Sequence, residues 1–468
     1  MTDPARTSAI VLAAGAGSRF GGGKLQATLG GRPILQRVLD QLAAAGLADV
    51  IVVLGDDASE LESAIKWRSE RPIRNPDPGR GLSSSVRIGL SALGPGAEAV
   101  LVVLGDQPLL DPQVLRALLD APSDPARPIV VPVYADDRGR NPVLLRPPAW
   151  TLGAALDGDQ GLGPLIRAHP ELVTEVPVAG RNPDVDTPGD LAALRWGLRV
   201  RANREQAERV REAPEAADFY GPVTSLFRAD PRRTDDPVLA ALIAEARPAE
   251  TWLDVGAGAG RYALGLALHV ARVVAIDPSP GMLAVLRELA DEYNIPNVQP
   301  IEARWPSEAT GELRADVGLI AHVGYDIEAI GPFVDALERA SGRLCLAVLN
   351  DVSPASGASG LWPATWGEER AELPGLPDFV ELLRARGRAP EVTDVERRPR
   401  DYASRADLLR WVRQQLFVEA GSERDRRLVA ELEAVTVETV AGVRLATQAA
   451  GVVGIVSWQP SKEQGGER

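Results

Sequence analysis

Two glycine-rich segments, each between an apolar run and a helical pattern, are the parts of this chain best suited to do chemistry. The first is LAAGAGSRFGGGK, Leu12–Lys24. Its glycines let the backbone approach a ligand closely, and successive N–H groups in such a loop bind anions. Arg19 and Lys24 add positive charge where a polyphosphate would lie. The alternative is a flexible turn with two surface cations.

Two aspartates far apart in the chain suggest a cation site beside this loop. Asp106 directly follows the apolar run VLVVLG, and Asp186 lies in PDVDTPGDL, just ahead of a helix that starts with proline. Ligands of open α/β sheets bind at the carboxyl ends of the strands, and two carboxylates there can share a hard cation such as Mg2+. The alternative for Asp186 is a helix N-cap.

The second glycine segment is WLDVGAGAGRYALGLA, Trp252–Ala267. Its glycines fall at 256, 258 and 260, and Arg261 stands where a dinucleotide fingerprint needs its last glycine. The next apolar run ends at Asp277, a position from which a carboxylate can accept hydrogen bonds from both hydroxyls of a ribose. The alternative is a related domain that has lost its ligand.

Short apolar runs alternating with amphipathic helices must position these residues. Such a pattern predicts parallel sheets covered on both faces, and hence an α/β chain of two consecutive three-layer α/β/α domains. The expected strands are 9–13, 50–54, 99–104 and 129–133 in the first half, and 251–255, 273–276, 317–321 and 343–349 in the second. The expected domains are 1–196 and 215–460, with a charged, solvated linker helix at 197–214 and a disordered tail at 461–468. Segment 354–377, rich in glycine, proline and tryptophan, is expected to be a lid-like loop.

Composition restricts the class of function. The chain has 468 residues and a formal net charge of -14, which argues against a protein that coats nucleic acid. Its single cysteine, Cys345, and its three separated histidines exclude an intramolecular disulfide and disfavour a zinc site. No apolar run is long enough to span a membrane and no signal pattern begins the chain, so we expect a cytoplasmic protein that acts on small molecules, without nucleic-acid or membrane partners.

The first half resembles the MobA-like nucleotidyltransferases, and most closely the molybdenum-cofactor cytidylyltransferases, over residues 8–196. The resemblance lies in the loop Leu12–Lys24, the GDQP and DVDTPGDL segments, and the segment RGLSSSVRIGL that begins at Arg80. It implies a Rossmann-like fold, catalytic roles for Lys24, Arg19 and Asp106, and Mg2+ on Asp106 and Asp186. It also implies nucleotide binding by Leu12, Ala13, Ala14, Gly15, Gly17, Gly21, Ser83 and Ser84.

The resemblance further implies transfer of a nucleotide to a phosphate-bearing acceptor such as the molybdopterin cofactor, and an association with molybdenum enzymes. Alanine at the third position of LAAG is typical of the branch that uses CTP, whereas relatives that use GTP favour LAGG. Two segments depart from the family. Arg140-Asn141-Pro142 replaces Gly-x-Pro, and Gly163 in GDQGLGPL replaces an arginine. Since these segments would face the acceptor, they leave its identity open.

The second half resembles the class I methyltransferases that use S-adenosylmethionine (SAM), over residues 215–459. The resemblance lies in the D-x-G-x-G-x-G turn and in Asp277, and it implies SAM binding by Asp254, Gly256, Gly258, Gly260, Asp277, Met282, Glu302 and Ala303. Segment ADVGLIAHVGYD would adjoin the methyl acceptor, so His322 and Tyr325 are candidates to contact it. The alternatives are a structural role for His322 and plain packing for Trp362 and Trp366.

The sequence therefore predicts a bifunctional enzyme that combines Mg2+-dependent nucleotidyl transfer with methylation of an unknown small molecule. A second hypothesis keeps the first fold as a GTP-using or oxidoreductase-like relative. In that hypothesis the second half binds SAM without catalysis and regulates the first. Turnover of SAM would separate the two.

Overall fold

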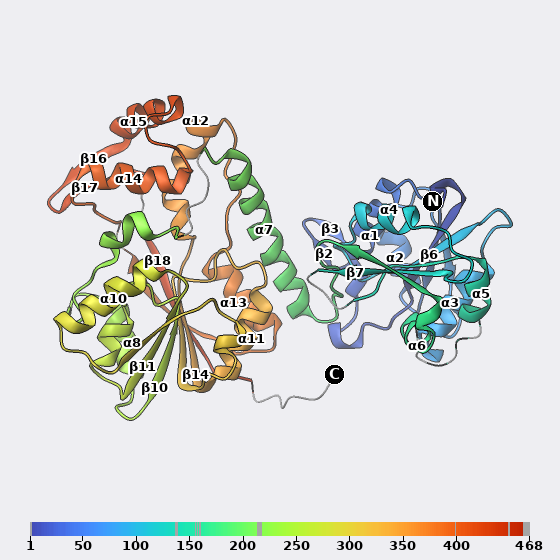
Figure 1. Ribbon diagram of the computed structural model, residues 1–468, viewed down its shortest axis with the longest axis horizontal. Helices are drawn as coiled ribbons and strands as arrows, with labels where there is room; N and C mark the ends of the chain where they lie inside the picture. The colour runs from blue at the N-terminus through green and yellow to red at the C-terminus, as the bar shows by residue number, and fades with distance from the viewer. Residues whose placement is uncertain are drawn as a thin grey trace. The chain divides into compact units, whose positions relative to one another are not determined.

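The computed structural model describes residues 2–135, 139–154, 156, 158, 161–212, 218–397, 399–447 and 450–461. The chain forms two compact units, Met1–Leu191 and Ala192–Arg468 (Figure 1). Parts of the expected linker (213–214), the start of the expected second domain (215–217) and the expected tail (462–468) lie outside the described residues.

The first unit is built on a seven-stranded sheet of order β5-β4-β1-β6-β8-β7-β9. All four strands expected for this half are present, and the structure adds β5, β8 and β9. Strand β8 is antiparallel to both β6 and β7, so the sheet is mixed and not wholly parallel. The strands are β1 (Thr7–Ala13), β4 (Asp49–Leu54), β5 (Arg71–Arg74), β6 (Ala99–Leu104), β7 (Ile129–Tyr134), β8 (Val143–Leu145) and β9 (Val173–Val178), and β2 (Thr28–Leu29) pairs with β3 (Arg32–Pro33) outside the sheet.

Helices cover both faces of this sheet, which confirms the predicted three layers. Alternate residues of β1 point to opposite faces. Ile10 and Leu12 share one core with α3, α5 and α6, while the apolar residues of α1 and α4 are buried on the other side (Figure 1). The helices are α1 (Ile34–Ala44), α2 (Ala58–Ala64), α3 (Leu82–Ser91), α4 (Pro112–Asp120), α5 (Pro147–Ala154) and α6 (Leu162–Ala168).

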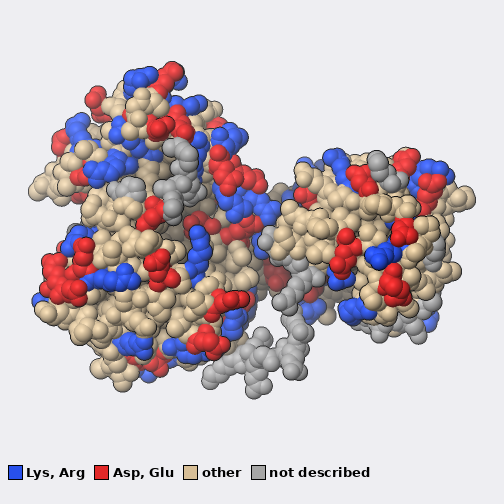
Figure 2. Space-filling view, in the orientation of Figure 1, with Lys and Arg blue, Asp and Glu red and all other residues tan. Residues whose placement is uncertain are grey.

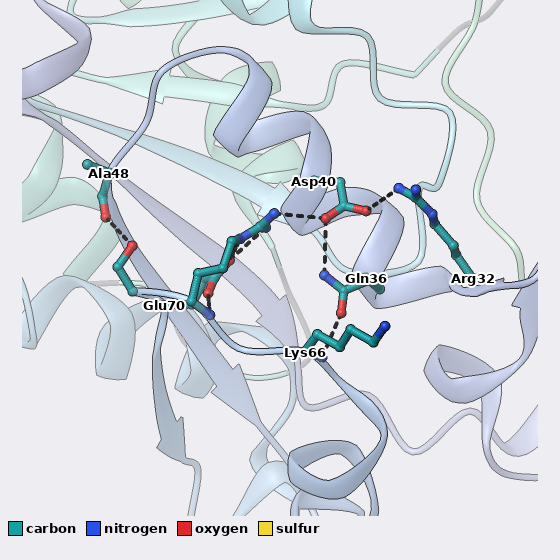
Figure 3. Close-up of polar contacts among 8 residues, drawn as sticks. Arg32, Gln36, Asp40, Ala48, Lys66 and Glu70 are labelled. Atoms are coloured by element: carbon teal, nitrogen blue, oxygen red, sulfur yellow. Dashed lines mark hydrogen bonds and ion pairs between the residues drawn. The ribbon is translucent and has the colours of Figure 1, made fainter.

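A polar network fixes α1, the helix that follows the glycine loop. Asp40 on α1 accepts hydrogen bonds from Arg32, Gln36 and Arg68, and the Gln36 carboxamide oxygen accepts one from the N–H of Lys66 (Figure 3). Burial raises the pKa of Glu70, but hydrogen bonds from Arg68 outweigh it and hold that pKa below its usual value. The network ties α1 to the segment ahead of β5.

The second unit has a seven-stranded sheet of order β12-β11-β10-β13-β14-β18-β15, in which only β18 is antiparallel to its neighbours. The four strands expected here are present, so the class I methyltransferase fold is confirmed, again with a mixed sheet. The strands are β10 (Thr251–Val255), β11 (Arg272–Asp277), β12 (Val298–Glu302), β13 (Ala315–Ala321), β14 (Ser341–Asn350), β15 (Glu391–Arg397) and β18 (Gly451–Trp458).

Helices α8 (Pro237–Glu245), α9 (Ala263–Ala267) and α10 (Pro280–Glu292) cover one face of this sheet. The other face is covered by α11 (Ile330–Ala340), α13 (Leu376–Ala385) and the long helix α7 (Pro188–Val210) (Figure 1). Within the second unit, Trp196 and Val200 of α7 are buried in this core, and the indole N–H of Trp196 donates to Ile327 O at 3.0 Å. One face of the helix expected to be solvated is therefore packed.

A helical cap completes the second unit. It consists of η8 (Pro354–Leu361), α12 (Trp362–Trp366), α14 (Arg405–Leu416), α15 (Glu423–Val435) and the hairpin of β16 (Thr436–Thr439) and β17 (Gly442–Leu445). Trp362 is 1% exposed in the cap core, and the indole N–H of Trp366 donates to Leu416 O. The two tryptophans thus pack inside the cap. The expected loop supplies η8 and α12, and the rest of the cap comes from the segment between β15 and β18.

Basic and acidic side chains are interspersed over the described residues on the face drawn in Figure 2. In the part of the chain that the structure describes, no helix combines the length and apolar character needed to cross a bilayer.

Candidate active sites

The first glycine loop follows β1 and contains backbone conformations that only glycine adopts easily. Gly21, Gly22 and Gly23 follow one another with φ of 88°, 97° and 63°, in the left-handed region that a Cβ disfavours. These turns bring Lys24 back over the carboxyl edge of the sheet. Of the residues predicted to bind the nucleotide, Leu12 and Ala13 end β1, and Ala14, Gly15, Gly17 and Gly21 form the loop after it.

Lys24 lies between the two aspartates predicted as metal ligands. Its Nζ is 2.6 Å from Asp106 Oδ2 and 3.4 Å from Asp186 Oδ1. Arg19 reaches the same group, with an Nη2 to Asp186 Oδ2 distance of 3.0 Å. The structure therefore brings all four charged residues of the predicted site together from three separate segments.

Backbone contacts hold the two carboxylates at this edge. The N–H of Val185 donates to the Asp106 carbonyl at 3.0 Å, which binds the DVDTP segment to the end of β6. Thr187, not Asp186, caps α7: its hydroxyl accepts from the N–H of Asp190, whose carboxylate accepts from the N–H of Thr187. The N-cap alternative for Asp186 is thereby excluded, and its carboxylate remains for the charged cluster.

A third carboxylate, Asp184, was not singled out from the sequence. Gln107 donates to it at 2.8 Å. Burial raises the pKa of Asp184 to about 6, and the neighbouring charges of Asp106 and Asp186 raise it as well. The sequence pattern Asp-Val-Asp could have indicated Asp184, because residues two apart in an extended segment point to the same side.

The serines predicted to bind the nucleotide are engaged within the protein. The Ser83 hydroxyl donates to Gly158 O at 2.6 Å, and the Ser84 hydroxyl donates to Gly81 O and accepts from Asn75. These hydroxyl contacts fix the first turn of α3, where the N–H of Ser84 also donates to Gly81 O at 3.1 Å.

Both departures from the family border one cavity. A cavity of about 670 Å³ is lined by Arg140, Asn141, Gly163, Ile166, Arg167, Pro170 and Glu175. The Arg140 guanidinium pairs with Glu175 at 3.0 Å. Asp159 and Gln160, in the second departing segment, lie outside the described residues.

The glycine turn of the second unit is closed by Asp277. Its carboxylate accepts a hydrogen bond from the N–H of Gly258 at 2.9 Å and another from the N–H of Ser279 at 2.8 Å. Burial raises the pKa of Asp277. A carboxylate held over the glycine turn at the end of β11 is where the sequence placed a ribose ligand.

Gly256 and Gly258 of this turn differ in the space available for a side chain. We therefore expect alanine to lower the stability of the protein more at Gly256 than at Gly258. A Cβ at Gly256 would lie 2.3 Å from Val323 Cγ2, whereas a Cβ at Gly258 would meet nothing within 4 Å, and both residues have positive φ. Gly256→Ala is expected to lower the free energy of unfolding by about 2–4 kcal/mol, from strain plus overpacking. Gly258→Ala is expected to lower it by about 1–2 kcal/mol, from strain alone.

Urea unfolding followed by tryptophan fluorescence measures both variants. Trp67 and Trp150 lie in the first unit and the other seven of the nine tryptophans in the second, so the signal reports mainly on the second unit. Equal losses of stability in the two variants would contradict the assigned contact with Val323.

Asp254 is fully enclosed below the same turn. It accepts a hydrogen bond from the N–H of Ala263, while its Oδ1 is buried without a partner among the described residues. Burial raises the pKa of Asp254 to about 7, with a further contribution from Asp277. An orphaned carboxylate oxygen at this depth is suited to a ligand that carries positive charge.

This pKa predicts a pH-dependent stability. The folded chain binds the Asp254 proton more tightly than the unfolded chain, whose carboxyl has a pKa near 3.8. The free energy of unfolding should therefore fall as pH rises from 4 through 7, by about 2–4 kcal/mol, and change little above that range. Asp254→Asn should reduce this slope by the Asp254 contribution in urea unfolding at pH 4–8, while the raised pKa values of Asp184 and Asp277 leave the remainder. A variant profile parallel to that of the wild type would show that Asp254 does not titrate there.

The remaining residues predicted to bind SAM lie beside Asp277. Glu302 ends β12 in register with Asp277, and the N–H of Ala303 donates to the Asp277 carbonyl at 3.2 Å. Met282 is buried in the first turn of α10. Asp218, which the sequence did not indicate, accepts from the Ser279 hydroxyl and from the N–H of Gly281, and so covers the start of the same helix.

His322 and Tyr325, the two residues predicted to contact the methyl acceptor, follow β13 and are both fixed by hydrogen bonds within the protein. His322 has φ of 58°, rare for a residue other than glycine, and its Nε2 is 3.3 Å from the Tyr262 hydroxyl. Burial lowers the pKa of His322 to about 4, so its ring is uncharged near neutral pH. The Tyr325 hydroxyl accepts from the N–H of Asn350 at 2.6 Å, and burial raises the pKa of Tyr325.

The folds and the clustered charges define a chain of two transferase-type domains, one of the nucleotidyltransferase class and one of the methyltransferase class. Comparison with known families agrees. Residues 9–173 match the MobA-like NTP transferase domain family, and residues 253–329 match a methyltransferase domain family. The chain thus carries a MobA-like nucleotidyltransferase domain followed by a methyltransferase domain.

Individual relatives match the first domain. The bifunctional protein GlmU of Sorangium cellulosum is 34% identical over 154 residues, which are 31% of this chain and 32% of that protein. The 2-C-methyl-D-erythritol 4-phosphate cytidylyltransferase of Cereibacter sphaeroides is 36% identical over 143 residues, 29% of this chain and 64% of that enzyme. A homologue of Mycobacterium tuberculosis Rv0371c from Mycobacterium sp. strain JC1 is 30% identical, with a TM-score of 0.38 over 41% of this chain and 95% of its own. The chain spans about a third of the length of the GlmU relative.

Proposed function

We propose that the chain is a bifunctional enzyme. The first domain transfers a nucleotidyl group from an NTP, with CTP favoured, to a phosphate-bearing acceptor and releases pyrophosphate. The second domain transfers the methyl group of SAM to a small molecule. The observation that carries the first assignment is the position of the Lys24 ammonium between Asp106 and Asp186 at the loop of a MobA-like domain.

The residues around Lys24 fit Mg2+. Asp106 Oδ1 is buried and has no partner among the described residues, and Asp186 exposes 33% of its side chain. Two carboxylates from separate segments, completed by water and phosphate oxygens, are the ligands that Mg2+ commonly takes. Bound there, Mg2+ supplies charge neutralisation at the α-phosphate and at the leaving pyrophosphate.

The chain's own residues supply the other interactions. The N–H groups of Leu12–Lys24 hold the phosphates, and Arg19 and Lys24 stabilise the negative charge that develops as pyrophosphate leaves. Lys24 must exchange its carboxylate partners for phosphate oxygens when the nucleotide binds. The acceptor phosphate is already anionic, so no general base is required, which agrees with the absence of histidine from the four predicted segments.

CTP and a phosphate acceptor are supported by two observations. The loop carries alanine at the third position of LAAG, and a relative that is 36% identical is named for cytidylyl transfer to a 4-phosphate. A molybdopterin cofactor is the acceptor that the sequence resemblance favours. The cavity of about 670 Å³ beside Arg140 and Gly163 is lined by both segments that depart from the family, and these departures leave the identity of the acceptor open.

The second assignment rests on the Asp277 carboxylate over the glycine turn, with Asp254 enclosed beneath it. Asp277 would accept hydrogen bonds from the ribose of SAM, and Asp254 would face its charged methionine part. Methyl transfer from a sulfonium is a direct displacement, in which positioning supplies most of the catalysis. We further propose a cytoplasmic enzyme with small-molecule substrates and no nucleic-acid or membrane partner, associated with molybdenum enzymes.

Thermal unfolding with each ligand tests the proposal, because a ligand that binds only the folded state raises its apparent stability. The protein is heated with Mg2+ and each of CTP, GTP, ATP and UTP, and separately with SAM. CTP and SAM are expected to raise the unfolding temperature. A larger effect of GTP would overturn the cytidylyl assignment, and no effect of SAM would overturn the bifunctional enzyme.

A further inference from the structure

Three polar residues lie along the carboxyl edge of the second sheet, at the ends of strands that do not carry the glycine turn. His322 follows β13, Asn350 ends β14 and Arg397 ends β15. Strands β13 and β14 are parallel, and β18 is antiparallel to both β14 and β15, so these three strands end at the same edge.

Each of the three residues has a buried atom without a hydrogen-bond partner in the described chain: His322 Nδ1, Asn350 Oδ1 and Arg397 Nε. Asn350 is 7% exposed. An unpaired buried polar atom costs free energy, so three of them at one edge indicate a site that a polar ligand completes.

The guanidinium of Arg397 reaches this edge because β18 begins with glycine. A Cβ at Gly451 would lie 2.5 Å from Arg397 Nη2 and 2.9 Å from Asp351 Oδ2. Without a side chain there, Arg397 Nη2 and Asp351 Oδ1 form an ion pair across β18 at 3.7 Å, a distance too long for a hydrogen bond, so the guanidinium N–H groups are not used up by it. Arg397 therefore keeps its capacity for a planar anion. It is also near enough for its charge to lower the pKa of His322, after the larger effects of burial and Arg261.

His322 is oriented from the side of the glycine turn. Its Nε2 meets the hydroxyl of Tyr262, which follows that turn, and the guanidinium groups of Arg233 and Arg261 lie 5.8 Å and 5.6 Å from the centre of the Tyr262 ring. Asp236 binds both arginines. Val323, next to His322, would collide with any side chain at position 256, so the residues after β13 lie directly against the turn that we assign to SAM.

We propose that the methyl acceptor is a small molecule that carries a carboxylate, bound by Arg397, and an O–H or N–H group, bound by His322 Nδ1. This inference rests on the proposed methyltransferase function and names the substrate class of the same site. Asn350 Oδ1 accepts a hydrogen bond from another N–H or O–H group of this small molecule. Arg397 suits a carboxylate because its planar fork matches the two oxygens.

The chemistry is balanced within this set of groups. A lone pair of the acceptor oxygen or nitrogen forms the bond to the methyl carbon, and the sulfur–methyl bond breaks with its electron pair left on sulfur. The O–H or N–H proton of the small molecule passes to His322 Nδ1, while the His322 Nε2–H donates a hydrogen bond to the Tyr262 hydroxyl oxygen. Burial keeps the free imidazole uncharged near neutral pH, so Nδ1 is available as the proton acceptor.

Titration calorimetry on the full chain with S-adenosylhomocysteine bound tests the carboxylate. The probes are glycolate, lactate, 4-hydroxybenzoate, serine and tyrosine, each paired with its carboxamide. At least one carboxylate is expected to bind about 10-fold more tightly than its amide, as for a charge-assisted hydrogen-bonded pair. Arg397→Gln should abolish this preference and Arg397→Lys should keep part of it. Arg314→Gln, the same charge change at the opposite edge of the sheet where Arg314 bonds to its own loop, should leave it intact.

The outcomes separate the two claims. If S-adenosylhomocysteine itself does not bind, the proposed methyltransferase function fails. If it binds and no carboxylate is preferred to its amide, or if Arg397→Gln keeps the preference, only the present inference fails.

Nitrogen NMR tests the role of His322, because the chain has only three histidines. The preferred probe is expected to shift the His322 Nδ1 resonance, and the analogue that lacks the hydroxyl or amino group is not. His322→Asn assigns the signal, and asparagine tolerates the left-handed backbone at this position. An Nδ1 resonance that responds equally to both compounds would overturn the contact.

Discussion

Asp106→Asn is expected to lower the rate of pyrophosphate release from the NTP by about 10³-fold or more, with little change in the fold. The replacement keeps the shape of the side chain but removes one of the two charges that would hold Mg2+ beside the α-phosphate. A single preorganised electrostatic contact to a developing charge is worth about 10²–10³ in rate, and loss of a metal ligand adds to this. The measurement is a coupled assay for pyrophosphate with CTP, Mg2+ and molybdopterin, the acceptor that the sequence resemblance favours, and a reaction without molybdopterin is the blank.

The matched control is Asp120→Asn, the same change at an exposed position at the end of α4. It should leave pyrophosphate release unchanged. The methyltransferase domain serves as an internal control, since Asp106→Asn should bind SAM as the wild type does. Pyrophosphate release within about 10-fold of wild type would contradict the assignment of Asp106 as a metal ligand.

Asp277→Ala is expected to weaken SAM binding by about 100-fold or more and to leave nucleotide binding intact. Each hydrogen bond to a charged group contributes about 1.5–3 kcal/mol, and Asp277 is placed to accept two from a ribose. The variant also loses the bonds from Gly258 and Ser279 that close the glycine turn, so the site becomes less ordered before the ligand arrives. Titration calorimetry with SAM measures the loss.

Asp291→Ala, on the exposed face of α10, is the matched control and should bind SAM normally. Heating the Asp277→Ala protein with CTP and Mg2+ should raise its unfolding temperature as in the wild type. If Asp277→Ala bound SAM with near wild-type affinity, the ribose would have to be held elsewhere and the class I assignment of the site would be wrong.

Local sequence predicted four of the seven strands in each sheet, the glycine turns and most of the charged residues of both candidate sites. A continuous apolar run that ends in aspartate identifies a buried strand and its carboxyl end. The aspartate follows one glycine in Val100–Asp106 and follows the run directly in Val273–Asp277. Parallel strands bring such ends to one edge, so the meeting of Asp106 with the loop that carries Lys24 could be expected. Asp186 lies between β9 and α7, away from a strand end, and the tertiary structure brings it to the same lysine.

Short or sparsely patterned segments gave no comparable signal. Strand β8 has only three residues, Val143–Leu145, so its direction depended on which neighbours it paired with. On α7, the buried Trp196 and Val200 stand among arginines, and the burial of this face depended on the core of the second unit. The residues that pack against Trp362 could not be predicted from the sequence, because they come from cap helices far along the chain.

What the sequence by itself determined is the succession of the main strands and turns along the chain, and with it the position of each glycine loop and of the carboxylates Asp106 and Asp277. These features depend on neighbours a few residues away, which the chain specifies directly. The tertiary structure alone decided which polar atoms remain without partners. Asn350, Arg397 and His322 are separated by 28 to 75 residues, and Gly451 lies further along the chain. Their meeting depends on strand order and on the room left by a missing side chain, which no local pattern encodes.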